Sequence, residues 1–526
     1  MRDRQGVVEG RHRLSAILAL LVAAAVPGTA AASAPRVLPA GSGGAPADWI
    51  VSARDGPAAR SLAQRAGARS VGVSGRYLVP RRRAGALAEA LDRRGLLRWA
   101  EPNQSLRRPT VVMTTTAFAW RDRLGLAGLN PPPVRPGSPQ LALLDTPVDL
   151  THPVFAGALL TAPDGMAPYD LHGTATASVA TGTGAGGVLG VWPGMRLANH
   201  AFPPDRLTCA DSAAMIDRAV ARGAAVINMS YGSDERCFTE FAALQNATLN
   251  GVVVVAAAGN EREFGNPAEY PGAFPHVIAV GALAVEERAA SFSNAGAAVD
   301  LAAPGVDVPA AVPWLFDPDG VADGVTALSG TSLSAPMVAA AAGLLRSARP
   351  GLTGGQVAAL LCASARDLPP RGWDRRTGCG APNVAAALRA PAPPRDPFEP
   401  NDDVVWIDGI GLGRPAPLMR TATVRATVTA HDDPVDVYRV RSRPGLRISL
   451  LPLSGGADLR VLDDTALDIA DRSSVLATSR RKGRRTDRAT VRKRGVIFIA
   501  VTHDRRAASR QSVYRLRFDG LRPKAK

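Results

Sequence analysis

Aromatic residues and cysteines are scarce in this chain of 526 residues. Phe, Trp and Tyr together make up 5% of it, which argues against a platform of stacked rings for single-stranded nucleic acid. The four cysteines show no C-x-x-C spacing and no histidine cluster accompanies them, so we do not expect a zinc site around them. With 46% hydrophobic and 21% charged residues, the chain is neither disordered nor a coiled coil. Its length corresponds to about two to four domains.

The middle of the chain lacks the net positive charge that both ends carry. Residues 1–119 carry 18 basic and 7 acidic side chains, a net charge of +11. Residues 395–526 carry 27 and 16, again +11, whereas residues 120–394 carry 17 and 23, or −6. This distribution indicates three separately built pieces rather than one nucleic-acid-binding body.

Long hydrophobic runs are also lacking, apart from one near the N-terminus. Four arginines lie within residues 2–13, an apolar run covers residues 14–26, and small residues follow over 28–34. The run has about 13 residues, whereas a membrane-spanning helix needs about 20. We therefore predict a cleaved signal peptide over residues 1–32 rather than a membrane anchor, and a secreted, extracellular protein.

The cysteines, Cys209, Cys237, Cys362 and Cys379, all lie in the middle piece. Outside the cytosol an even number of cysteines indicates disulfides, and four of them allow three connectivities. The pairs that are nearest in sequence, Cys209 with Cys237 and Cys362 with Cys379, are our prediction.

Hydrophobic patterning predicts three domains. Residues 48–108 follow a β-α-β-α-β pattern, typical of a small α+β module. Residues 120–390 alternate helical patterns with strands that are apolar on both faces, which predicts an α/β domain, a mostly parallel sheet with helices on both faces. After a Pro-rich stretch, residues 396–520 contain short alternating segments between turns, which predict an antiparallel β-sandwich.

Four polar residues of the middle piece are candidate catalytic residues when they are considered together. Asp145 and Asn260 each follow an apolar strand, and ligands of parallel sheets bind at the carboxyl ends of strands. His172 opens a helix of small residues, and Ser332 lies in a Gly-rich turn entering a helix. Each of three residues also has an ordinary structural explanation. Asp145 can begin an Asx-turn, His172 can be a structural histidine, and Ser332 can be a helix cap. Together they supply a nucleophile, a base, an orienting acid and an amide donor.

The order Asp145, His172, Asn260, Ser332 resembles that of the subtilisin-like serine proteases, the subtilases. The motifs extend over roughly residues 139–390 and read LALLDTPVDLTHP, HGTATASVATG, AAVINMSYG, VVVVAAAGNE, NPAEYP…VIAVGA, ASFSNAG, VDLAAPG and GTSLSAPMVAAAAGLL. The resemblance implies a subtilisin-like fold and a serine endopeptidase. In such an enzyme Ser332 attacks the peptide carbonyl, His172 acts as base and acid, Asp145 orients His172, and Asn260 stabilises the oxyanion.

The same resemblance implies two segments that bind the substrate backbone: Ser230, Tyr231 and Gly232, and Ala257, Ala258 and Gly259. Polypeptide substrates would join them as an additional strand. Calcium is common in the family as a structural ion, but we identify no ligand set here, so we expect no cofactor. Subtilases usually carry Gly where Pro147 stands, and Pro fixes φ and removes an N–H, so the turn beside Asp145 is expected to differ.

The flanking pieces resemble known companions of subtilase domains. Residues 48–108, ending in WAEPNQ, are similar to the family's propeptide, an intramolecular inhibitor and folding aid, which predicts a precursor cut between about Ser105 and Ala119. Residues 396–520, with FEPNDD…DPVDVYRV…VYRLRF, are similar to the bacterial pre-peptidase C-terminal domain.

Nine Arg or Lys residues lie between Arg480 and Arg494. Such a run is commonly a solvated loop, and as a functional site it would attract anionic cell-envelope polymers. We expect no specific nucleic acid partner.

Two other functions are alternatives to a serine endopeptidase. An α/β-hydrolase esterase needs G-x-S-x-G and the order Ser, Asp, His, and this chain has neither arrangement around Ser332. A catalytically impaired subtilase-fold binding protein of the cell envelope is the other alternative, because of Pro147.

Overall fold

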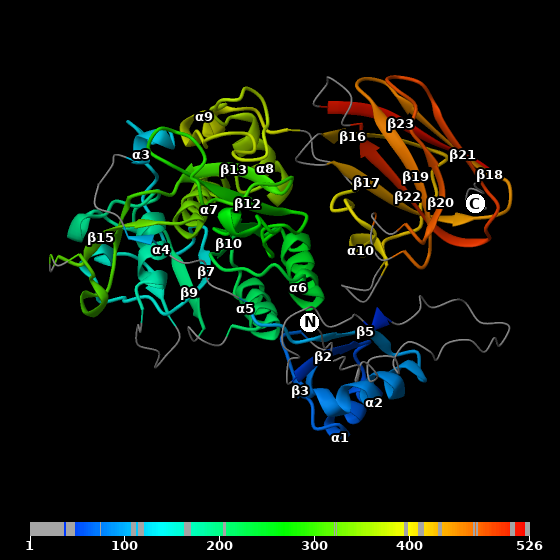
Figure 1. Cartoon of the computed structure of the whole chain (residues 1–526), viewed down its shortest axis with the longest axis horizontal. Helices are drawn as coiled ribbons and strands as arrows, with labels where there is room; N and C mark the ends of the chain where they lie inside the picture. Colours follow the sequence, from blue (N-terminus) through cyan, green and yellow to red (C-terminus); the bar gives the residue numbers. More distant parts are fainter. Residues whose placement is uncertain are drawn as a thin grey trace, which may run out of the picture. The chain divides into compact units, whose positions relative to one another are not determined.

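The structure is a computed structural model of the whole chain (Figure 1). It describes residues 36–37, 48–73, 75–106, 112–113, 120–162, 170–202, 207–319, 321, 323–393, 398–408, 415–429, 434–466, 469, 472–504 and 511–520. The predicted signal peptide, residues 1–32, lies outside this set. Within the described residues, no helix combines the length and the apolar character needed to cross a membrane.

The N-terminal module is a five-stranded sheet with two helices on one face (Figure 1, blue). The strand order is β1-β5-β2-β4-β3. Its elements are β1 (Arg36–Val37), β2 (Asp48–Ala53), α1 (Pro57–Arg65), β3 (Arg69–Ser70), β4 (Arg76–Pro80), α2 (Arg81–Asp92) and β5 (Leu97–Pro102). The predicted β-α-β-α-β pattern corresponds to β2, α1, β4, α2 and β5, while the short strands β1 and β3 extend the sheet at its edges.

The two faces of this sheet have different partners, because side chains alternate along a strand. Val51 and Val79 pack under α1 and α2. Ile50 and Leu78, on the opposite face, pack against Cys209 and its neighbours in the central piece.

The central piece is built on a parallel sheet of seven strands, in the order β13-β12-β11-β10-β7-β9-β8. Its strands are β7 (Leu141–Asp145), β8 (Leu160–Thr161), β9 (Leu197–Ala201), β10 (Val226–Met229), β11 (Val253–Ala257), β12 (Val277–Leu283) and β13 (Val299–Pro304). A smaller sheet is made of β6 (Val112–Met113), β14 (Val308–Ala311) and β15 (Val325–Ser329), with β15 in the middle. The predicted parallel sheet is therefore confirmed.

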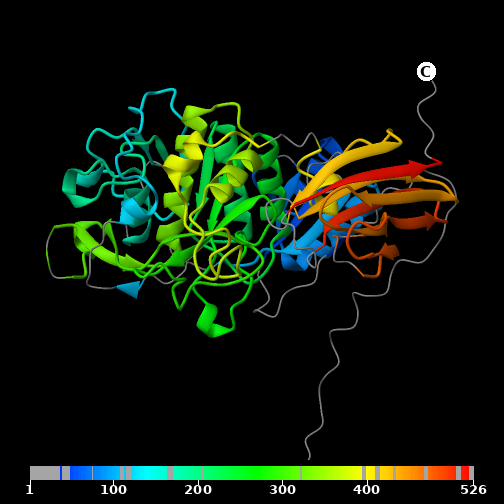
Figure 2. The same ribbon diagram turned by 90° about the horizontal axis from the view of Figure 1, so that it is seen from above.

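Helices cover both faces of the large sheet, as its strand composition predicts (Figure 2). Along β7, Leu141 and Leu143 face one core, and Ala142 and Leu144 face the other. The first core is completed by α4 (His172–Thr181), α7 (Thr331–Ala348), α8 (Gly354–Ala363) and α9 (Val384–Arg389). The second contains α5 (Cys209–Ala221) and α6 (Phe238–Leu249). Among the described residues of this piece, the remaining helices are α3 (Trp120–Arg123) and four short 3₁₀ turns, Pro153–Phe155, Ala185–Gly187, Arg262–Phe264 and Trp314–Phe316.

Two disulfides join the cysteines as predicted, Cys209 to Cys237 and Cys362 to Cys379. The first links the N-terminal ends of α5 and α6, and the second links α8 to the segment that leads into α9.

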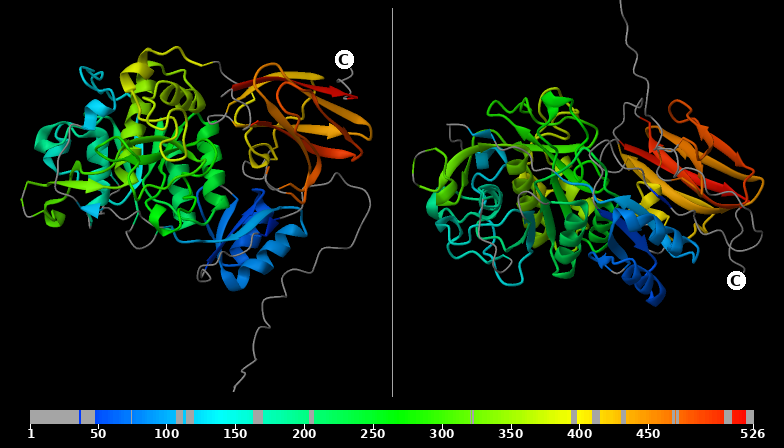
Figure 3. Two further views of the ribbon diagram at one scale, coloured as in Figure 1. Left: turned by 45° about the horizontal axis from the view of Figure 1, so that its top comes forward. Right: turned by 60° about the horizontal axis from the view of Figure 1, so that its bottom comes forward.

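The C-terminal piece consists of two four-stranded antiparallel sheets (Figure 3, yellow to red). The first sheet contains β16 (Thr423–Thr429), β23 (Gln511–Asp519), β18 (Leu446–Pro452) and β21 (Asp487–Val491), and the second contains β17 (Val435–Ser442), β22 (Gly495–His503), β19 (Ala457–Asp463) and β20 (Val475–Ser479). Buried residues of both sheets, such as Ile448 and Ile499, form one core, so the sheets pack as a sandwich. A single helical turn, α10 (Val404–Ile407), precedes it.

Candidate active site

Asp145 and His172 are in direct contact in the structure. Asp145 ends β7 and is buried, and its Oδ1 lies 2.6 Å from Nδ1 of His172, the first residue of α4. Two further donors hold the carboxylate: Thr146 N donates to Oδ1 at 2.7 Å, and Thr176 Oγ1 donates to Oδ2 at 2.9 Å. A carboxylate on Nδ1 places the ring proton there, which leaves Nε2 as the basic nitrogen of the neutral imidazole.

The start of α4 is tied to the end of β7 by a small polar network. Asp170 Oδ1 accepts from His172 N at 2.9 Å and from Thr146 Oγ1 at 2.7 Å, and Thr146 Oγ1 accepts from Gly173 N at 2.9 Å. A Cβ on Gly173 would lie 2.1 Å from the carbonyl oxygen of Thr146, so the approach requires glycine. With Pro147 in the next turn, the contact between Asp145 and His172 is still made.

Ser332 lies in the first turn of α7 and is fully buried. Its Oγ donates to the carbonyl oxygen of Ser230 at 3.5 Å, and Ser230 Oγ donates to the carbonyl oxygen of Ser332 at 3.0 Å. Ser230 directly follows β10, which pairs with β7 in register up to Met229 and Leu144. Ser332 is thus held at the same edge of the sheet as Asp145, and α4 and α7 pack in the same core.

Asn260 follows β11 and is joined to the residue that precedes the serine. Its Oδ1 accepts from Thr331 N at 3.0 Å and from Thr331 Oγ1 at 2.9 Å. Two donors on Oδ1 fix the orientation of the carboxamide, because nitrogen and oxygen are otherwise interchangeable. The other end of the carboxamide is therefore Nδ2, a donor that is not bonded to Thr331. Sequence reasoning had not singled out Thr331.

The two predicted substrate segments lie at the carboxyl ends of β10 and β11, which are neighbours in the sheet. Tyr231 is buried, and its hydroxyl lies 2.7 Å from Ser212 Oγ. Ala257 and Ala258 are also buried. Gly259 has φ +102°, and a Cβ there would lie 2.3 Å from Asn294 Nδ2. All six residues of these two segments are therefore buried in the structure.

A buried acid lies beneath one of these segments and was missed from the sequence. Ser212 Oγ donates to Glu240 Oε1 at 2.5 Å, and the same hydroxyl contacts Tyr231. Burial raises the pKa of Glu240 to about 7. The sequence signal was a single glutamate within the otherwise apolar start of the helix FTEFAAL.

The N-terminal module contacts the central piece through one carboxylate and through a short stretch of backbone. Glu101 of β5 accepts from Phe238 N at 2.7 Å and Thr239 N at 2.6 Å, at the start of α6, and from Thr239 Oγ1. Burial raises the pKa of Glu101, while these donors favour its ionised form. Past β5 the chain pairs with the central piece: Leu106 N donates to Leu207 O at 2.9 Å, and Cys209 N donates to Gln104 O at 2.8 Å.

Glu101 also lies near the sulfurs of Cys209 and Cys237. Because these sulfurs are bonded to each other, they offer no thiolate to a metal ion.

Comparison with known proteins agrees with this arrangement. The Subtilase family (Peptidase_S8) matches residues 138–380. The chain is 34% identical over 286 residues to the thermophilic serine proteinase of Bacillus sp. (strain AK1), covering 50% of this chain and 66% of that protein. It is 37% identical over 223 residues to subtilisin DY of Bacillus licheniformis, covering 41% of this chain and 77% of that protein.

Among solved structures, the fold is similar to fervidolysin from Fervidobacterium pennivorans, described as a keratinolytic enzyme related to subtilisin. The TM-score is 0.61 at 18% sequence identity, and the match covers 92% of this chain and 94% of that one. At this identity the likeness concerns the fold alone. The sequence matches, however, reach 34% and 37% identity. The chain belongs to the subtilase family of serine proteases.

Proposed function

We propose that the protein is a secreted serine endopeptidase, made as a precursor, in which Asp145, His172 and Ser332 form the catalytic triad. The contact between Asp145 Oδ1 and His172 Nδ1 carries this proposal. Ser332 supports it, since it lies at the same edge of the sheet and in the first turn of α7.

The triad acts by acyl transfer. Ser332 Oγ attacks the carbonyl carbon of the scissile peptide as its proton passes to His172 Nε2. The same proton is then given to the leaving amine, and an acyl-enzyme remains. Water, activated by His172, hydrolyses the acyl-enzyme. Asp145 keeps the imidazole in the tautomer with Nδ1 protonated and stabilises the imidazolium that forms.

The carbonyl oxygen of the scissile peptide becomes negatively charged in the tetrahedral intermediate, and hydrogen-bond donors that are already in place stabilise this charge. Asn260 Nδ2 and the backbone N–H of Ser332 serve this role, and the N-terminus of α7 adds its dipole. The carboxamide needs no reorientation during the reaction, because Thr331 already holds its oxygen.

Covalent labelling tests the reaction class. A fluorophosphonate probe reacts with a serine hydroxyl that a neighbouring base activates, so we expect one label per mature chain, on Ser332. Peptide mapping by mass spectrometry locates it. Folded, processed protein that takes up no label would instead favour a subtilase-fold binding protein of the cell envelope.

The N-terminal module is proposed to act as an intramolecular inhibitor. Residues 104–106 pair with residues 207–209 through an isolated antiparallel bridge of Ser105 with Thr208. This backbone pairing ties the end of the module to the start of α5 in the central piece. The side-chain contacts that hold the module include Glu101 at the start of α6 and a buried ion pair of Arg76 with Asp217 at 2.9 Å.

Glu101→Gln in the separate module, residues 36–108, is expected to raise its inhibition constant against mature enzyme by about 10- to 100-fold. The change weakens charge-assisted hydrogen bonds from Phe238 N and Thr239 N, each about 1.5–3 kcal/mol. Glu89→Gln is the matched control, because Glu89 is exposed on α2 and pairs with Arg93 of the same module. Equal inhibition constants for both variants would contradict the proposed role of Glu101.

The basic segment 480–494 is proposed to bind anionic cell-envelope polymers. Eight of its nine cationic side chains are exposed, and the ninth, Lys493, pairs with Asp464. Replacing Arg481, Lys482, Arg484 and Arg485 by Gln should weaken retention on an immobilised polyanion and flatten its salt dependence. Arg515→Gln, an exposed change outside the segment, serves as control. Retention that is unchanged in the fourfold variant would refute the proposal.

A further inference from the structure

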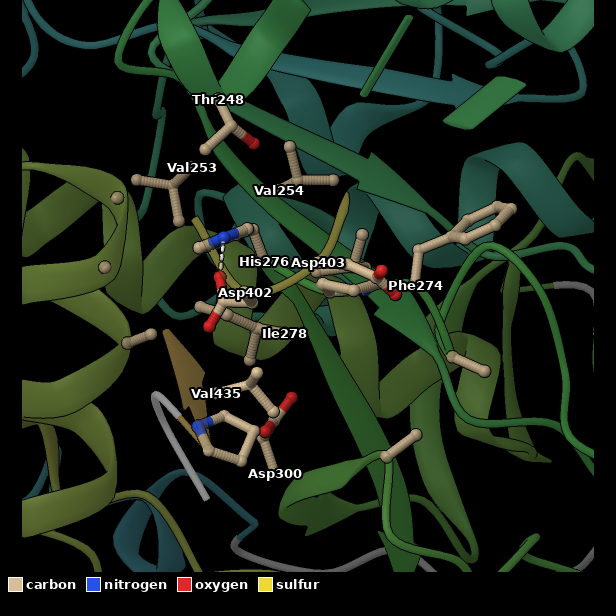
Figure 4. Close-up of a pocket in the computed structure, with 18 of the residues that line it drawn as sticks. Thr248, Val253, Val254, Phe274, His276, Ile278, Asp300, Asp402, Asp403 and Val435 are labelled. Atoms are coloured by element: carbon tan, nitrogen blue, oxygen red, sulfur yellow. Dashed lines mark ion pairs between the residues drawn. The ribbon is translucent and has the colours of Figure 1, made fainter. Parts of the chain in front are cut away.

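A second cluster of ionisable groups lies away from the proposed triad, between the central sheet and the C-terminal piece. His276 immediately precedes β12, while Glu399 and Asp402 lie in the segment before α10. His276 Nε2 forms an ion pair with Asp402 Oδ2, and Glu399 Oε2 lies 3.6 Å from the same nitrogen. Figure 4 shows the imidazole and the Asp402 carboxylate pointing toward each other.

The cluster is largely withdrawn from solvent. The side chain of Asp402 is 6% exposed, that of His276 is 12% and that of Glu399 is 25%. Asp402 Oδ2 receives no hydrogen bond from any described residue. Both His276 and Asp402 line a cavity of about 330 Å³. Apart from the imidazole of His276, Asp402 Oδ2 therefore lacks the donors that normally accompany a buried anion. The second carboxylate is held by the backbone, since Glu399 Oε2 accepts from Asn401 N at 3.2 Å.

We propose that His276, Glu399 and Asp402 bind a divalent cation of the zinc class. One ligand atom from each residue lies within 4.8 Å of the others, so a single ion can reach all three. A neutral imidazole with two carboxylates is a donor set that zinc accepts, with solvent completing its coordination. Calcium, in contrast, takes six to eight oxygen ligands and rarely uses nitrogen.

The ion would join two parts of the chain that are far apart in sequence. His276 belongs to the central sheet, whereas Glu399 and Asp402 belong to the start of the C-terminal piece. The adjacent Asp403 is committed elsewhere, since its Oδ1 accepts from Val404 N at 2.6 Å and Ile469 N at 2.8 Å. Because binding requires both parts in place, the ion stabilises their folded arrangement.

The test uses the full chain with Ser332→Ala, so that self-cleavage cannot confuse the result. After removal of metal by chelation, titration calorimetry with Zn²⁺ should give one site per chain, and Zn²⁺ should raise the midpoint of thermal unfolding. His276→Gln and Asp402→Asn should each weaken Zn²⁺ binding by more than about 10-fold. Glu286→Gln, an exposed carboxylate change on the central piece, should leave binding unchanged.

Three results would overturn the proposal. They are equal Zn²⁺ binding in the His276→Gln variant, binding of Ca²⁺ without binding of Zn²⁺, and a folded chain that binds neither ion. The last result would mean that His276 and Asp402 form an ion pair and that the cluster binds no metal ion. Far-UV circular dichroism of each variant confirms that it is folded. If His276→Gln fails to fold, Glu399→Gln replaces it, with the same expected loss.

Discussion

Ser332→Ala is expected to lower kcat for peptide hydrolysis by about 10⁶-fold and to leave the chain unprocessed, with the N-terminal module attached. The size is the one known from subtilisins themselves, in which the members of the triad act as a unit. Alanine removes the only hydroxyl in the first turn of α7 that is tied to Ser230 at the end of β10. A hydrolysis assay, with N-terminal sequencing of the purified protein, measures both effects.

Ser334→Ala is the matched control, since it removes the same atom two residues further along α7. Ser334 Oγ donates to the carbonyl oxygens of Ala303 at 3.0 Å and Pro304 at 3.1 Å, so its role is to hold the helix against β13. We expect a loss of about 1 kcal/mol in stability and near-normal activity in this variant. Processing that continues in Ser332→Ala would mean that another protease matures the chain, and hydrolysis that continues would remove Ser332 from the mechanism.

The sequence predicted those parts of the fold that depend on local patterning. A parallel sheet was indicated by apolar strands such as LALLD that alternate with helical patterns, for example the helix that begins at His172. Polar residues directly after these strands indicated a site at the carboxyl edge of the sheet. The disulfide pairs were predicted from proximity in sequence, and the structure joins the same cysteines. The alternating segments of the C-terminal piece predicted antiparallel strands, because one buried face leaves a clear period of two.

Residues whose role depends on a distant partner were not predicted. Glu101 meets the start of α6 across 137 residues of sequence, and its motif gives no sign of this contact. Thr331 orients Asn260 from 71 residues away, and an ordinary helix-start threonine looks the same in sequence. His276 follows a proline in an otherwise ordinary stretch of sequence, and only the fold brings Glu399 and Asp402 to it.

Asn260→Ala is expected to lower kcat by about 10²- to 10³-fold with little change in KM. This fold-change is the loss of kcat found in a subtilisin when one donor to the oxyanion is removed, so it is taken from this family. The carboxamide acts on charge that exists only in the transition state, so substrate binding in the ground state does not need it. Asn250→Ala, an exposed asparagine at the C-terminal end of α6, makes the same chemical change away from the site and should leave both constants unchanged.

Thr331→Val completes the series, because it tests the orientation of the amide rather than its presence. Valine keeps the backbone N–H that donates to Asn260 Oδ1 and removes only the hydroxyl donor, so one of two restraints on the carboxamide remains. We expect a loss of about 10-fold in kcat, corresponding to one hydrogen bond of about 1 kcal/mol or slightly more. In the double variant with Asn260→Ala, the valine should add almost nothing, since there is no amide left to orient. Losses that multiply instead would show that Thr331 acts on Ser332 directly, and the proposed division of roles between these two neighbours would be wrong.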